Sequence, residues 1–138
     1  MSAIDPAFAA RLAAGEGFSH RDHIAVATEL LAAHDFLEAA QRYSAGIRAI
    51  AAEAGQPEKF NTTITLAFLS LIAEHMASGP YEDAEDFIDR NPELLARGLL
   101  EAWYPAERLA SPLARELFLM PAAAQGSGSL ARRPPSTV

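Results

Sequence analysis

The sequence contains no cysteine, one lysine and one tryptophan among its 138 residues. Without cysteine the chain itself supplies no disulfide, no thiolate zinc site, no cysteine nucleophile and no iron–sulfur ligand. No stretch approaches the roughly 20 consecutive apolar residues of a membrane span. The first residues, MSAIDPAFAARLAAGEG, show no basic run followed by an apolar core. We therefore expect a cytoplasmic protein with no membrane association and no secretory signal.

Basic residues are also scarce. The chain has 18 Asp and Glu against 11 Lys and Arg, which gives a formal net charge of −7. Binding to a nucleic-acid backbone depends on clustered Lys and Arg, so we expect no nucleic-acid partner. The patterns G-x-G-x-x-G, G-x-x-x-x-G-K-S/T and G-x-S-x-G are missing too, which disfavours nucleotide-binding folds and α/β hydrolases.

Alanine is abundant, with 30 copies in the chain. It has the best helix propensity and loses no side-chain entropy in a helix. Apolar residues at helical spacing predict three long helices, over about 19–34, 36–54 and 61–76, and no run alternates as a strand does. We predict an all-α protein: a compact bundle of three long helices plus short C-terminal helices. Residues 1–120 are expected to form a single helical domain, and residues 121–138 a disordered tail.

Local signals place several helix ends. Ser19 followed three residues later by Asp22 predicts a capped start for the first long helix. Asn61 is the expected cap of the third. Asn91 followed by Pro92 predicts another start, with a helix running through the leucines at 94, 95, 99 and 100 to Trp103.

The first candidate site is a histidine pair. His20 and His23 lie three residues apart at the start of a helix, so the two imidazoles share adjoining parts of one face. The helix dipole favours neutral imidazole there, and neutral imidazole is the form that binds metal. Two hypotheses stand: a functional pair that binds a divalent metal or acts as base and acid, or one packed and one solvated imidazole.

The candidate partner of this pair is the polar start of the helix at Asn61. Asn61 and Thr65 are four residues apart and share a face, within a run that also contains Thr62 and Thr63. Either these groups cap the helix and bond back to the preceding turn, or they line a polar pocket that faces His20 and His23.

The remaining polar features favour structural roles. His34 is about 16 Å from His23 along the helix, which is too far for a shared ligand shell, and it suits the helix C-terminus. His75 is expected to pair with a carboxylate or face water. The acidic run from Glu82 to Asp89 lacks the order and the glycine of an EF-hand, so we interpret it as a solvated helix face.

The chain resembles a group of short, all-helical bacterial proteins of unassigned function. The resemblance rests on FSHRDHIAVA (18–27), KFNTTITLAF (59–68) and WYPAERLASPLAR (103–115), which match F/W-x-H-x-x-H, T-x-T and a C-terminal pattern. It covers nearly the whole expected domain and implies a site at these positions. In this group a His can occupy the position of Asn61, and an amide is a much weaker metal ligand.

Two functions follow as hypotheses. The first is a small-molecule enzyme, metal-assisted or not, in which His20 and His23 are metal ligands or a base and acid pair, while Asn61 and Thr65 orient the substrate or water. The second is a non-catalytic interaction module or accessory subunit that binds another protein. A homodimer is compatible with either hypothesis.

Overall fold

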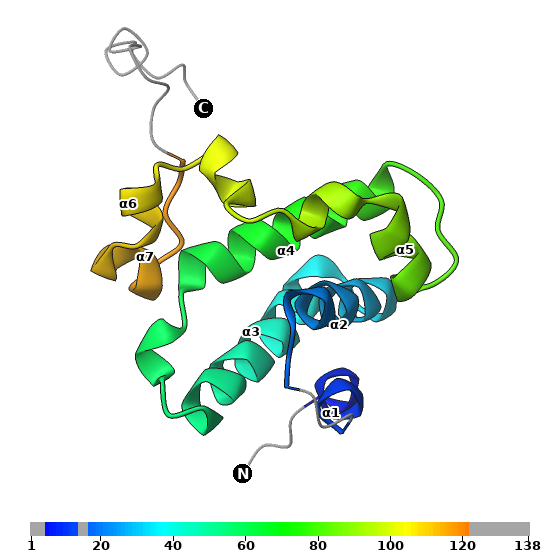
Figure 1. Cartoon of the computed structure of the whole chain (residues 1–138), viewed down its shortest axis with the longest axis horizontal. Helices are drawn as coiled ribbons and strands as arrows, with labels where there is room; N and C mark the ends of the chain where they lie inside the picture. Colours follow the sequence, from blue (N-terminus) through cyan, green and yellow to red (C-terminus); the bar gives the residue numbers. More distant parts are fainter. Residues whose placement is uncertain (1–4, 14–16, 122–138) are drawn as a thin grey trace, which may run out of the picture.

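The computed structural model describes residues 5–13 and 17–121, and every regular element in these ranges is a helix (Figure 1). The all-α class is therefore confirmed. The prediction of a disordered tail falls outside the described residues apart from residue 121. No helix of the described part is long and apolar enough to cross a membrane.

The elements are α1 (Pro6–Leu12), α2 (His20–Ala33), α3 (Phe36–Glu53), η1 (Pro57–Lys59), α4 (Thr62–Ala77), α5 (Ala84–Arg90), η2 (Pro92–Leu95), η3 (Leu99–Ala102), α6 (Ala106–Leu109) and α7 (Pro112–Glu116), where η marks a 3-10 helix.

The three longest helices begin after capping residues, and two of these caps, Ser19 and Asn61, were predicted. Ser19 accepts from the backbone N–H of Asp22, and the Asp22 carboxylate accepts from the Ser19 N–H, which completes a capping box at α2. Asn61 caps α4. Asp35 caps α3, so the change of direction between α2 and α3 needs neither glycine nor proline.

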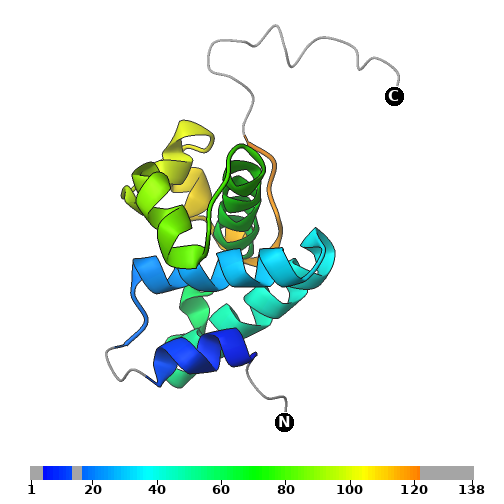
Figure 2. The same cartoon turned by 90° about the vertical axis from the view of Figure 1, so that its right-hand side faces the viewer.

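The helices form three layers (Figure 2). α2 and α3 make the middle layer, α1 covers one side of it, and α4 with the later elements covers the other. The core lies between these layers, and its largest fully buried members are Tyr43, Phe8, Phe87, Ile24, Leu69, Ile72, Ile88 and Leu94.

α1 was not predicted. Its start is marked by Asp5, whose side chain accepts from the Ala7 N–H, followed by Pro6 at the first helical position. The helix has only seven residues and a single fully buried side chain, Phe8, which stacks on Phe18 at 5.6 Å between ring centroids. So short a helix has almost no periodic signal, and Phe8 also packs on Tyr43 of α3, which lies far away in the sequence.

The predicted single helix from Asn91 to Trp103 is wrong. The segment forms two 3-10 turns, η2 and η3, interrupted at Gly98, which has a left-handed φ of 69°. Leu94 and Leu100 are both buried. The break lets the chain turn across α2 and α4 while each turn inserts one leucine into the core, which a straight helix cannot do here.

Candidate functional site

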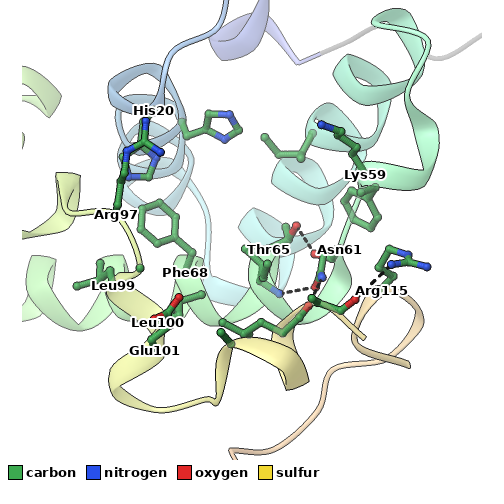
Figure 3. A pocket seen from close by; sticks show the side chains of 18 of the residues that line it. His20, Lys59, Asn61, Thr65, Phe68, Arg97, Leu99, Leu100, Glu101 and Arg115 are labelled. Atoms are coloured by element: carbon green, nitrogen blue, oxygen red, sulfur yellow. Dashed lines mark hydrogen bonds between the residues drawn. The ribbon is translucent and has the colours of Figure 1, made fainter. Parts of the chain in front are cut away.

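A cleft of about 1090 Å³ lies between the middle layer, α4 and the segment that follows η2. All four residues predicted for the site, His20, His23, Asn61 and Thr65, line it. Figure 3 shows His20 and Arg97 at one end of the cleft and Asn61, Lys59 and Arg115 at the other. The walls between these ends are largely apolar and include Tyr43, Ile47, Phe60, Ile64, Phe68, Leu95, Leu99, Leu100 and Leu109.

His20 is the first residue of α2 and is held by a contact from the opposite wall. Its Nε2 donates to the backbone carbonyl of Leu94 at 3.1 Å, and its ring packs on Phe68 with centroids 5.3 Å apart. This bond joins the start of α2 to η2 and so helps to define one end of the cleft.

His23 is partly buried one turn further along α2. Its ring meets the edge of Phe18 at 4.7 Å between centroids, and no hydrogen bond to its ring nitrogens occurs among the described residues. Burial, with a smaller contribution from His20, lowers the pKa of His23 from 6.5 to about 4, although Asp22 acts in the opposite direction. The ring is therefore neutral at pH 7 and offers one donor and one acceptor.

The histidine pair does not fit a metal. The two ring centroids are 6.4 Å apart with planes tilted by 41°. Two imidazoles on one tetrahedral ion, with metal–nitrogen bonds of about 2.0–2.1 Å, place their centroids about 5 Å apart. No group of three or more His, Cys, Asp or Glu in the described part of the chain is arranged to hold a metal ion. Within the described residues, the two predicted ligands are therefore not spaced as a metal pair and have no third His, Cys, Asp or Glu beside them.

Asn61 and Thr65 have structural partners. The Asn61 carboxamide oxygen accepts from the Ile64 N–H at 2.9 Å, and its nitrogen donates to the Leu109 carbonyl at 2.8 Å. The Thr65 hydroxyl donates to the Asn61 carbonyl at 2.7 Å. Capping and bonding to the preceding turn account for the Asn61 oxygen and the Thr65 hydroxyl, and the long-range bond to Leu109 accounts for the Asn61 nitrogen. They share the cleft with the histidines, but in the described structure no hydrogen bond joins the two pairs.

The other two threonines fasten the C-terminal segment to α4. Thr62 donates to the Arg115 carbonyl at 2.9 Å. The buried Thr63 hydroxyl donates to the Leu117 carbonyl and accepts from the Leu119 N–H at 3.0 Å. The hydroxyl-rich start of α4 thus fixes the chain that closes one side of the cleft.

His34 and His75 do not line the cleft. His34 is the C-cap residue of α2. His75 contacts the Leu71 carbonyl through Nδ1 and lies 3.2 Å from the Glu93 carboxylate through Nε2, in agreement with the expected pairing to a carboxylate.

Two carboxylates of the acidic run at α5, Glu85 and Asp89, pair with arginines from other helices. Glu85 accepts hydrogen bonds from Arg21 and Arg11 at 2.7 and 2.9 Å, and these bonds hold the pKa of Glu85 below its ordinary value. Asp89 accepts a further bond from Arg21. The prediction of a simple solvated face missed these contacts, because the partners are more than 60 residues apart in sequence.

The sequence did not reveal the cationic ends of the cleft. Arg97 follows η2, Lys59 ends η1 and Arg115 lies in α7, so no spacing rule connects them. Lys59 had one visible signal, since it is the sole lysine of the chain.

No protein-family model, curated protein or solved structure matches the chain. The likeness to short helical bacterial proteins therefore rests on the sequence patterns alone.

Proposed function

We propose that the chain binds and transforms a small molecule in the cleft, with His23 as its proton acceptor. The observation that carries this proposal is the position of His23: a partly buried, neutral imidazole that lines a cavity large enough for a small organic molecule. Small-molecule sites are usually concave and mostly apolar, with a few polar groups that fix the ligand.

The two histidines have different roles in this proposal. His20 is anchored on the Leu94 carbonyl and positions the start of α2. His23 has no such anchor among the described residues, so its nitrogens are available to a ligand. A neutral ring keeps the free lone pair that a proton acceptor needs.

The proposal is tested by NMR with a mixture of small aromatic and aliphatic fragments added to the ¹⁵N-labelled full chain. We expect binders to shift the imidazole signals of His23 and the amide signals of Phe68 and Leu99. Ala96 is exposed and lines the cleft, so Ala96→Phe should abolish these shifts. Ala102→Phe, at an exposed position outside the cleft lining, is the matched control.

Acylation by diethylpyrocarbonate, followed by mass spectrometry, tests the role of His23 separately, because this reagent modifies neutral imidazole. We expect His23 to be modified at pH 6 and to be protected by a bound fragment. If no fragment binds in the cleft, or if bound fragments leave the reactivity of His23 unchanged, the proposal is wrong.

A protein-interaction module is the second candidate, favoured by exposed apolar side chains near α7. Leu113, Leu117, Phe118 and Met120 are 46–69% exposed. Exposed apolar groups gathered in one stretch are typical of surfaces that bind another protein, including a second copy of the same chain. Light scattering over a range of concentrations tests self-association: Leu117→Glu should abolish it, whereas Leu37→Glu, on α3, should not.

A further inference from the structure

In the described part of the chain, many of the cations without a salt bridge line the cleft. Among the residues that the structure describes, four arginines form salt bridges to carboxylates: Arg11, Arg21, Arg42 and Arg90. Five Lys and Arg side chains form none there: Arg48, Lys59, Arg97, Arg108 and Arg115. Three of these five line the cleft.

The two cations outside the cleft have other partners. Arg48 lies over the ring of Phe60 at 4.3 Å, and Arg108 donates to the Met120 carbonyl. Arg115 makes only a long contact of 3.5 Å to the Ala110 carbonyl. In a chain with 18 acidic and 11 basic residues, most cations are expected to find carboxylates. In the described structure Lys59, Arg97 and Arg115 have no carboxylate partner, and all three line the same cavity. This arrangement points to a ligand that carries a negative charge.

We propose, on the basis of the function proposed above, that the ligand is an apolar carboxylic acid whose carboxylate binds Arg97 at the histidine end of the cleft. The guanidinium group is planar and matches a carboxylate with two parallel hydrogen bonds, which a lysine ammonium cannot do. Arg97 follows η2, whose Leu94 carbonyl holds His20, so the arginine and the histidine pair belong to the same end of the cleft (Figure 3).

The apolar walls of the cleft suit the apolar body of the proposed carboxylic acid. Phe68, Leu99 and Leu100 lie next to this end and form an apolar surface against which an aliphatic or aromatic body can pack. Glu58 and Glu101 also line the cleft, but neither carboxylate lies within 4.0 Å of a basic side chain in the described structure.

The test compares 2-naphthaleneacetic acid with its uncharged amide by isothermal titration calorimetry of the full chain at pH 7. We expect the acid to bind about tenfold more tightly, since the charged pair replaces a neutral hydrogen bond. Arg97→Gln should abolish this preference and leave the affinity for the amide unchanged. Arg115→Gln, at the opposite end, should keep the preference.

Other binding results would overturn the carboxylate assignment, its placement at Arg97, or the ligand class. Equal affinity for acid and amide overturns the carboxylate assignment and leaves the cleft as a small-molecule site. Loss of the preference in Arg115→Gln, but not in Arg97→Gln, overturns the placement at Arg97. If neither naphthalene compound binds while fragments still bind at His23, the ligand class is wrong. If no fragment binds either, the proposed function fails as well.

Discussion

Gly46 of α3 lies directly against the ring of Phe8 of α1, so closely that a Cβ atom at position 46 would overlap the ring. Both residues are buried, and Phe8 also stacks on Tyr43 with centroids 6.0 Å apart. This contact attaches the first helix to the middle layer. A glycine inside a helix usually weakens it, so its presence here has a packing reason.

Gly46→Ala is expected to destabilise the protein by about 1–3 kcal/mol, because overpacking outweighs the gain in helix propensity. Urea unfolding measures the change. Gly79→Ala is the matched control, since no atom lies within 4 Å of the added Cβ. Combining Gly46→Ala with Phe8→Leu should recover part of the loss. An unchanged or raised stability for the single variant would contradict the close contact.

The pKa of His23 predicts a pH-dependent stability. The unfolded ring binds a proton near pH 6.5, whereas the folded ring does so only near pH 4. Between these values the unfolded state binds more protons, so stability falls as the pH falls from 6.5 to 4, by at most about 3 kcal/mol. His23→Gln should show a smaller loss over the same window. NMR titration of the His23 imidazole provides the direct measurement, and a midpoint near 6.5 would contradict the burial.

Glu85 joins three helices, because it lies on α5 and accepts from Arg11 of α1 and Arg21 of α2. These side chains are partly exposed, so solvent screens the pairs, and Glu85→Gln should cost about 0.5–1 kcal/mol at low salt. The cost should shrink in 1 M NaCl. Glu82→Gln serves as control, because its carboxylate forms no salt bridge in the described structure. An effect that does not depend on salt would exclude the ionic explanation.

The hydroxyl of Thr63 satisfies two backbone groups of the C-terminal segment, the Leu117 carbonyl and the Leu119 N–H. Thr63→Val keeps the volume but leaves both groups without their partner, at a cost of about 1–3 kcal/mol. Hydrogen exchange should speed up at Leu119. Thr62→Val removes one exposed bond and should have a smaller effect. Equal effects of the two variants would show that burial of Thr63 is unimportant.

Local sequence signals located several residues of the candidate site on their helices. His20 and His23 follow a capping box, and Asn61 is itself a cap, so the positions of these residues on their helices were predictable. Whether the two helix starts meet depends on long-range packing. The structure places them on one cleft, but the polar groups of Asn61 and Thr65 are occupied by two local hydrogen bonds and by the bond from Asn61 to the Leu109 carbonyl.

The chain's own residues determined its class and most of its long helices, because alanine content, apolar spacing and capping groups act within a few residues. The tertiary structure decided three other features: the attachment of α1 through Phe8 and Gly46, the break at Gly98, and the gathering of Arg97, Lys59 and Arg115 around one cavity. These features depend on contacts between residues far apart in the chain. Such contacts form only when the helices pack, so local sequence patterns do not predict them.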